Sequence, residues 1–342
     1  MAPNTTLMTK VTPILTDTHG RTHNYLRISL SEKCNLRCTY CMPHDGIELT
    51  PSEDLMTADE IISIARVFVE NGVDKIRLTG GEPLVRKDFS YILEELSKLG
   101  VRFSITTNAL LTHRFIDDFK RFGLQDINVS LDSLNAEKFK FITRRDQYKK
   151  AFENINQLIA EGFHVKVNAV LMKGFNEDEI VDFIKLTKDR DLNVRFIEFM
   201  PFDGNEWNKN KLVSQAEILN RVNDHFGIEA LQPLVNEKNF TARNFKIKGF
   251  KGSFGIISSV TNPFCDSCNR IRLTANGRLK NCLFSNAETD LLTPFRAGEN
   301  LEQLIDKALN KKEAVRAGMT DFDQLTNPDL HNNNRSMIAI GG

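Results

Sequence analysis

The cysteines of this chain fall into two triplets with the spacing of metal-binding loops. The 342-residue sequence has six of them, which are Cys34, Cys38 and Cys41 near the start and Cys265, Cys268 and Cys282 towards the end. Thiolates bind soft metals, and a closed structural zinc site takes four protein ligands, so three cysteines leave one coordination position open. His44 offers a fourth ligand to the first triplet. Zinc is therefore an alternative there, and equally at the second triplet.

The second triplet lies in the most basic stretch of the chain. Residues 241–280 include eight Lys or Arg and one acidic residue, Asp266, whereas the whole chain is neutral, with 45 basic and 45 acidic residues. The motif CNRIR places Arg270 and Arg272 at alternate positions beside the cysteines, and guanidinium groups bind phosphate oxygens bidentately. Since no global field draws the chain to nucleic acid, we expect a local anion site and no nucleic-acid partner.

Repeated βα units must position these loops. Between residues 26 and 200, short β-branched or apolar runs alternate with amphipathic helical stretches, which predicts a parallel sheet. Capping-box spacing at Thr57 and Glu60, and again at Asn176 and Glu179, marks helix starts. Six such units form either an open doubly wound sheet or an incomplete barrel. The six predicted strands are Tyr25–Leu30, Lys75–Thr79, Val101–Thr107, Asp126–Leu131, His164–Leu171 and Val194–Phe199.

Five of these strands are polar on one face. Because side chains alternate with period two, Leu26 and Ile28 oppose Arg27, and the same division recurs along the next four strands. Parallel strands covered by helices are normally apolar on both faces, and unpaired buried cations are costly. The pattern favours a barrel whose interior holds a polyanionic ligand; solvent-exposed positions or ion pairs are the alternative. The sixth strand is ambiguous, because Arg195 shares a face with apolar residues and Glu198 lies opposite.

The alternation ends after Met200. Residues 202–210 are polar and turn-rich, so we predict a first domain over residues 1–202 and a second over residues 203–342. Neither a signal peptide nor a membrane-spanning run is evident, so we expect a soluble, cytoplasmic protein with no membrane partner. In the second region we predict a helix near Ser214–Phe226, strands at Phe245–Phe250 and Gly255–Ser259, and a charged helix around Leu301–Ala314.

The motifs around the first triplet resemble those of the radical S-adenosylmethionine superfamily. The CxxxCxxC loop follows a predicted strand directly, and Gly80-Gly81-Glu82-Pro83 follows the next one. By itself, a Gly-Gly-x-Pro turn is equally typical of a tight strand-to-helix connection. The resemblance implies that the first triplet holds a [4Fe-4S] cluster whose free iron is chelated by S-adenosylmethionine. The cofactor contacts that it implies are Tyr40, Gly81, Ser130 and Met200.

Together with the CxxCNRxR…C triplet and the C-terminal Gly341-Gly342, these motifs resemble the GTP 3′,8-cyclase (MoaA) family of molybdenum cofactor biosynthesis over residues 21–342. The resemblance implies an incomplete (β/α)6 TIM-like barrel, with a smaller C-terminal α+β region that carries a second [4Fe-4S] cluster. The open iron of that cluster would bind the guanine of GTP. A 5′-deoxyadenosyl radical would remove the ribose 3′ hydrogen, and the carbon radical would close onto C8.

The resemblance also implies site residues and partners. Arg272, Gly341 and Gly342 are implied in cyclisation, with the glycine tail entering the active site. The implied partners are GTP, a reductant of the flavodoxin or ferredoxin type, the downstream cyclic pyranopterin monophosphate synthase, and a second copy of the chain in a homodimer. Ala109, where Gly is usual, and Ser336, where Pro is common, depart from the family pattern. The implied GTP contacts are Arg27, Arg77, Thr106, Lys166, Arg270, Ile271 and Arg272, with Lys75 and Arg195 as further candidates.

Two other functions stay open at this point. A peptide-modifying maturase of the same superfamily with an auxiliary cluster shares both triplets, but has no need of inward-facing cations or of the Arg270 and Arg272 pair. A zinc-stabilised binding protein without redox chemistry accounts for the cysteines alone.

Overall fold

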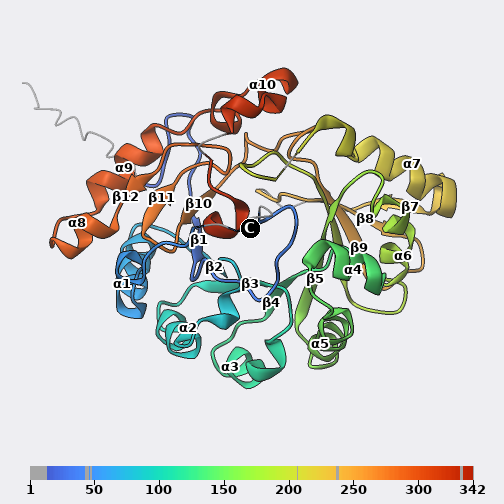
Figure 1. Cartoon of the computed structure of the whole chain (residues 1–342), viewed down its shortest axis with the longest axis horizontal. Coiled ribbons are helices and arrows are strands. Elements are labelled where there is room, and N and C mark those ends of the chain that lie inside the picture. The colour runs from blue at the N-terminus through green and yellow to red at the C-terminus, as the bar shows by residue number, and fades with distance from the viewer. Residues whose placement is uncertain are drawn as a thin grey trace, which may run out of the picture.

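The computed structural model describes residues 14–42, 46, 48–205, 207–235, 239–331 and 334–341. Within them, twelve strands form one sheet, which curves around a central opening (Figure 1). The six predicted strands form its middle, run parallel, and end within one residue of the predicted positions. They are β1 Tyr25–Ser29, β2 Lys75–Thr79, β3 Arg102–Thr107, β4 Asp126–Ser130, β5 His164–Leu171 and β6 Asn193–Glu198.

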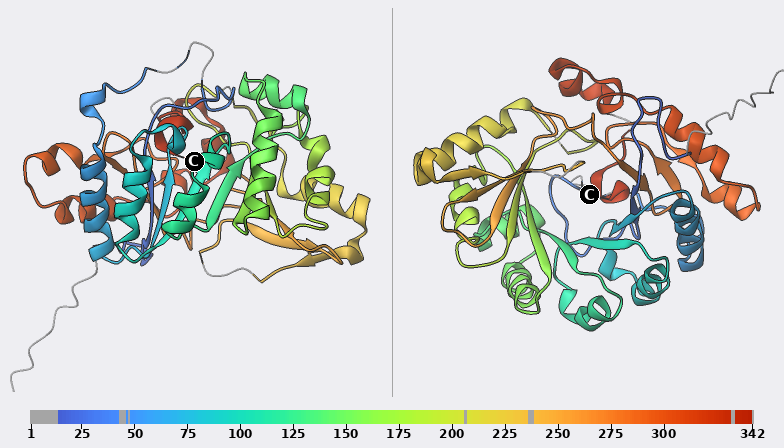
Figure 2. Two further views of the ribbon diagram at one scale, coloured as in Figure 1. Left: turned by 90° about the horizontal axis from the view of Figure 1, so that it is seen from below. Right: turned by 180° about the vertical axis from the view of Figure 1, so that it is seen from behind.

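Helices connect these strands and cover the outside of the sheet (Figures 1 and 2). The predicted capping box starts α1, with Thr57 Oγ1 accepting from the Glu60 amide and the Glu60 carboxylate accepting from the Thr57 amide. The apolar faces of the strands, such as Leu26 and Ile28, are fully buried against the helices. The predicted incomplete barrel is confirmed. Its helices are α1 Ala58–Glu70, α2 Phe89–Ser97, α3 Ile116–Arg121, α4 Ala136–Thr143, α5 Tyr148–Ala160 and α6 Ile180–Lys185.

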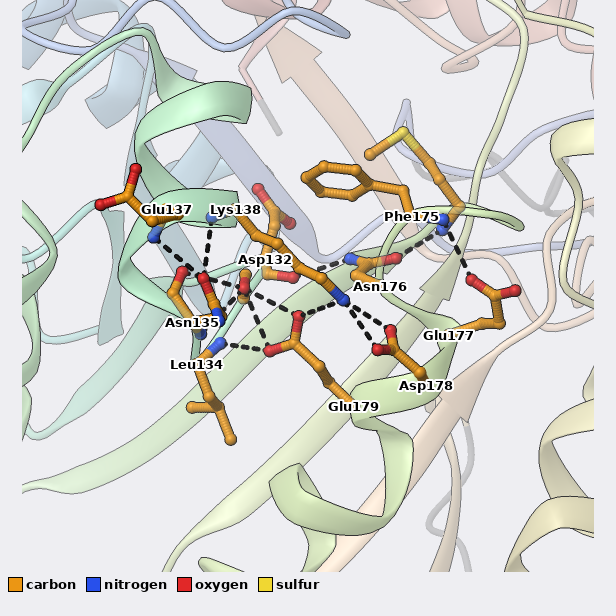
Figure 3. Close-up of polar contacts among 12 residues, drawn as sticks. Asp132, Leu134, Asn135, Glu137, Lys138, Phe175, Asn176, Glu177, Asp178 and Glu179 are labelled. Carbon is orange, nitrogen blue, oxygen red and sulfur yellow. Dashed lines mark hydrogen bonds and ion pairs between the residues drawn. The ribbon is translucent and has the colours of Figure 1, made fainter.

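The second predicted cap is wrong. The Asn176 side chain does not cap the helical turn that follows it. Instead it accepts from the Met172 amide at 2.8 Å and donates to the Asp132 carbonyl at 2.7 Å (Figure 3). It also donates to the Val170 carbonyl at 2.9 Å. The bond to Asp132, 44 residues away, has no signature in local spacing. Asn176 therefore ties the loop after β5 to the loop after β4.

The C-terminal region extends the parallel sheet at both edges. β9 (Ser253–Ile257) pairs in parallel with β6, and β10 (Arg270–Leu273) pairs in parallel with β1. These two strands follow each other in the sequence but lie at opposite edges of the parallel part, so the segment 258–269 crosses from one edge to the other. This crossing segment carries Cys265 and Cys268.

The remaining strands are antiparallel additions, with α7, α8 and α9 outside them, whereas α11 lies at the central opening (Figure 1). The predicted strands Phe245–Phe250 and Gly255–Ser259 both begin two residues earlier than expected. The first of them ends at Ile247 instead of Phe250, because Gly249, with φ of 84°, lies in the turn that follows. No helix in the described ranges is long and apolar enough to cross a membrane. These elements are β7 Leu231–Pro233, β8 Arg243–Ile247, β11 Arg278–Lys280, β12 Thr289–Asp290, α7 Gln215–Phe226, α8 Leu292–Arg296, α9 Glu302–Asn310, α10 Phe322–Thr326 and α11 Met337–Ile340.

Candidate active site

Strand register places three arginines side by side inside the barrel. Arg27 of β1 lies opposite Arg272 of β10 on one side and opposite Arg77 of β2 on the other. Because in-register residues of parallel strands point to the same face, all three side chains project inward. They line one cavity together with Arg195 and Arg270.

The same cavity reaches both cysteine triplets. The volume of the cavity is about 280 Å³. A single water needs about 10–15 Å³, so the cavity has room for a sizeable ligand. It lies at the carboxyl ends of the strands, where barrel active sites are found. The sequence-predicted site residues that line it are Cys34, Cys38, Cys41, Tyr40, Gly81, Thr106, Ser130, Met200, Cys265, Cys268, Cys282 and the five arginines.

The cavity carries a surplus of positive charge. Among the described residues that line it, Asp132 is the single carboxylate. Burial, with repulsion between neighbouring guanidiniums, lowers the pKa of Arg27 to about 10 and that of Arg272 to about 9. Nε of each of these two arginines is buried without a hydrogen-bond partner among the described residues. Such a group of cations is suited to a polyanionic ligand.

Three of the predicted GTP contacts lie elsewhere. Lys166, at the opposite end of the barrel interior, pairs with Asp126 at 2.6 Å, and Lys75 Nζ lies 5.2 Å from the centre of the Tyr25 ring. The side chain of Ile271 is fully buried in the hydrophobic core, on the other face of β10. Gly342 lies outside the described residues, as does His44, the alternative zinc ligand.

The first triplet lies on a loop that follows β1 and is held by the end of α4. The amides of Arg37 and Thr39 donate to the carbonyls of Thr143 and Ile142, at 3.0 and 2.9 Å. Burial raises the pKa of Cys34 to about 11, and it also raises the pKa values of Cys38 and Cys41. Metal binding requires thiolates, so a cationic iron centre would compensate this cost of burial.

The donor set and its surroundings fit an iron–sulfur cluster with an amino-acid cofactor. All six cysteines are unpaired thiols. A Cβ on Gly81 would lie 2.5 Å from the Lys33 carbonyl, so only glycine allows this backbone to approach the cysteine loop. In the part of the chain that the structure describes, no three His, Cys, Asp or Glu are arranged to hold a single metal ion. A [4Fe-4S] cluster instead binds its thiolates on separate irons.

Sequence reasoning missed two polar residues of the site, Asn108 and Asp132. Asn108 Nδ2 donates to Asn35 Oδ1 at 2.7 Å and lies 3.8 Å from Cys34 Sγ. The backbone amide of Asn108 donates to the carboxylate of Glu82 at 2.7 Å. Glu82 is itself buried, and that burial raises its pKa to about 7. Asn108 follows the carboxyl end of β3, and that position is the signal that could have identified it.

Asp132 supports the cysteine loop through Tyr40. The Tyr40 hydroxyl donates to Asp132 Oδ2 at 2.7 Å, and the Val170 amide donates to Oδ1 at 2.9 Å. Burial raises the pKa of Asp132 to about 6. In Figure 3, the Asp132 carbonyl accepts from Asn176, and Glu179 accepts from the Leu134 amide and pairs with Lys138. The loops after β1, β4 and β5 are therefore connected directly.

The second triplet has a different electrostatic environment. Although burial would raise the pKa of Cys268, the charges of Arg270 and Lys312 lower it to about 6. Arg21, near the start of the described chain, donates to the Cys265 carbonyl at 3.1 Å and to the Ala314 carbonyl at 2.7 Å. Arg21 thus ties the crossing segment to the residues that follow α9. The lowered pKa of Cys268 favours its thiolate, the form that binds metals.

The C-terminal tail reaches the same cavity. Met337 and Ile338 of α11 line it, and the end of the chain lies near the centre of the barrel opening (Figure 1). Gly341 has φ of 72°, and a Cβ there would lie 2.5 Å from Thr79 Cγ2. A glycine is required at this contact with the end of β2.

Comparison with known proteins identifies two regions. Residues 28–187 match the Radical SAM superfamily and residues 192–317 match Molybdenum Cofactor Synthesis C. The chain is 49% identical over 332 residues to molybdenum cofactor biosynthesis protein 1 of Bos taurus, covering 95% of this chain and 51% of that protein. It thus spans about half the length of such relatives.

Two further relatives match along most of their own length. The mitochondrial GTP 3′,8-cyclase of Arabidopsis thaliana is 47% identical, with 97% of this chain and 84% of that protein covered. The GTP 3′,8-cyclase of Listeria welshimeri is 42% identical, with 96% and 99% covered. Among solved structures, Streptococcus suis SuiB has a TM-score of 0.59 at 16% identity, covering 85% of this chain and 68% of that one. That likeness supports the fold.

Proposed function

Because this chain belongs to the GTP 3′,8-cyclase family, we propose that it converts GTP to (8S)-3′,8-cyclo-7,8-dihydroguanosine 5′-triphosphate by radical S-adenosylmethionine chemistry, in the first step of molybdenum cofactor biosynthesis. One observation supports this most strongly: both cysteine triplets and five inward-facing arginines line a single cavity. The triplets account for the redox chemistry, and the arginines account for a triphosphate.

In this proposal the two triplets have separate roles. Cys34, Cys38 and Cys41 would hold one [4Fe-4S] cluster beside S-adenosylmethionine, and Cys265, Cys268 and Cys282 would hold a second cluster facing GTP. When bound, the cluster and S-adenosylmethionine supply a 5′-deoxyadenosyl radical, which accepts hydrogen from the ribose 3′ position. The Gly80-Gly81 backbone, Tyr40, Ser130 and Met200 would orient the cofactor.

The arginines would bind and orient the substrate. The row of Arg272, Arg27 and Arg77 would donate to the triphosphate oxygens, with Arg195 and Arg270 on either side. Thr106 Oγ1 is buried without a partner among the described residues, so its hydroxyl would donate a hydrogen bond to the same ligand. Fixed donors of this kind align the ribose, and proximity and orientation contribute strongly to rate. Lys75, Lys166 and Ile271 are weaker candidates, because their side chains lie away from the cavity.

The tail and the partners complete the proposal. Gly341 and Gly342 would enter the filled site, where the adjoining Met337 and Ile338 would exclude water from the radical chemistry. By resemblance to the family, we expect a reductant of the flavodoxin or ferredoxin type, a homodimeric state and a downstream synthase as partners. The cytoplasmic location stays a prediction, since one relative is named mitochondrial.

Incubation of the full-length, iron- and sulfide-reconstituted protein with S-adenosylmethionine and GTP tests the function. With GTP deuterated at the ribose 3′ carbon, we expect one deuterium in the 5′-deoxyadenosine that forms, together with a cyclised triphosphate. ATP in place of GTP serves as the control. If 5′-deoxyadenosine forms equally with and without GTP and carries no deuterium, the cyclase activity is contradicted and another radical S-adenosylmethionine activity is favoured. If the protein binds zinc in place of a reducible cluster, both the cyclase activity and any other radical S-adenosylmethionine activity are contradicted.

A further inference from the structure

Lys312 is a buried lysine next to the second cysteine triplet. It follows α9, and 4% of its surface is exposed. Its Nζ donates to the Arg270 carbonyl at 3.1 Å and to Cys268 Sγ at 3.5 Å. The ammonium group is therefore directed at sulfur in a place where solvent screens it little.

The surroundings of Lys312 hold it there. His19 Nε2 bonds with the Lys312 carbonyl at 3.1 Å, and Arg21 donates to the next two carbonyls along the chain, those of Glu313 and Ala314. Desolvating an ammonium is expensive unless it gains strong partners. The hydrogen bonds of Lys312 Nζ to the Arg270 carbonyl and to Cys268 Sγ offset part of this desolvation free energy. A purely structural contact at this position would not require a charge.

We propose that Lys312 sets the reduction potential of an iron–sulfur cluster on the second triplet, through a charge-assisted N–H···S hydrogen bond to Cys268. This inference rests on the second cluster of the proposed function. Reduction adds one electron from an external donor to the cluster, without forming or breaking a bond. Hydrogen bonds to the sulfurs and a nearby positive charge raise the reduction potential of a cluster, because they stabilise its more negative, reduced form. Lys312 is thus a positioning and tuning residue.

The test is a potentiometric titration followed by EPR, with dithionite as the electron donor. It uses the full-length chain with Cys34, Cys38 and Cys41 replaced by Ala, so that only the second triplet can carry a cluster. In this background, Lys312→Met should lower the ratio of reduced to oxidised cluster at a fixed potential by about tenfold, equivalent to a shift of about 59 mV for one electron. Lys312→Arg, which keeps the charge, should stay close to the parent. Lys311→Met is the matched control, because Lys311 is the exposed neighbour.

The outcomes distinguish a failure of the role of Lys312 from a failure of the proposed function. A cluster that binds but keeps the parent potential in Lys312→Met overturns the role of Lys312 and leaves the proposed function intact. A shift in Lys312→Arg equal to that in Lys312→Met also overturns it. If the Met variant fails to fold, Lys312→Gln replaces it, since the amide keeps a donor and removes the charge. Failure of the second triplet to bind any cluster overturns the proposed second cluster and this inference together.

Discussion

At the residue scale, the site depends on arginine charges that have too few carboxylates in the cavity to pair with. Arg27, Arg77 and Arg272 point to one space because in-register residues of parallel strands share a face. Asp132, the carboxylate that lines the cavity among the described residues, already accepts from the Tyr40 hydroxyl. The free protein therefore holds buried cations at a cost, which a bound polyanion would relieve.

The first prediction concerns Arg272. Arg272→Ala should raise the GTP concentration needed for half-maximal turnover by about 10- to 150-fold, since a hydrogen bond to a charged group contributes about 1.5–3 kcal/mol. Uncoupled cleavage of S-adenosylmethionine should persist, because the first triplet is untouched. Steady-state assays of both products measure this. Arg278→Ala is the control, as Arg278 lies in the same basic stretch but is exposed. Equal loss of both activities would show that Arg272 has been misassigned.

At the element scale, the segment 258–269 and the C-terminal tail must be held across the barrel. Glu198, on the outer face of β6, accepts from the amides of Val260 and Thr261, at 2.9 Å each, and from the Thr261 hydroxyl. It also accepts from the Gln215 amide at the start of α7. The glutamate that made the sixth strand ambiguous in sequence is thus the anchor of the segment that carries Cys265.

Glu198→Ala should lower the free energy of unfolding by about 3 kcal/mol or more, because it leaves several buried donors without an acceptor. Urea titration of the full-length protein measures this loss. Glu153, exposed on α5, is the control, and Glu153→Ala should change stability by about 0.5 kcal/mol or less. A Glu198→Ala variant as stable as the parent would refute the anchoring role.

Arg335 holds the tail in a comparable way. Its guanidinium lies 2.9 Å from Glu288 and 3.7 Å from Glu32, and it donates to Asn276 Oδ1 at 3.1 Å. We predict that Arg335→Ala frees α11, so that carboxypeptidase removes the last residues about tenfold faster, as expected for a locally destabilised segment. Mass spectrometry follows the trimming. Arg335→Lys should give an intermediate rate, and an unchanged rate in Arg335→Ala would exclude this anchor.

At the scale of the whole molecule, neutrality hides a segregated charge pattern. The chain has equal numbers of acids and bases, yet six arginines line one interior cavity. The C-terminal region completes that cavity, because β9 and β10 extend both edges of the sheet and the tail enters the opening. Ligand binding should therefore stabilise the fold as a whole.

GTP at about 100 times its Kd should stabilise the folded state by about 2.7 kcal/mol, which raises the Tm of a chain of this length by about 4 °C. Differential scanning calorimetry on the full-length protein measures this shift. Guanosine at the same concentration should give a much smaller shift, because it lacks the triphosphate. Equal shifts with GTP and guanosine would mean that the arginines do not bind the triphosphate.

The amino-acid sequence by itself determined the six central strands and their inward cations, because alternation is a local property of a strand. Cysteine spacing likewise located both triplets. Tertiary structure alone decided which cations meet. Lys75 and Lys166 have the same pattern as Arg27, but they lie away from the cavity. The position of Lys312 beside Cys268, and of β9 and β10 at opposite edges, comes from contacts between distant segments, for which local spacing holds no signal.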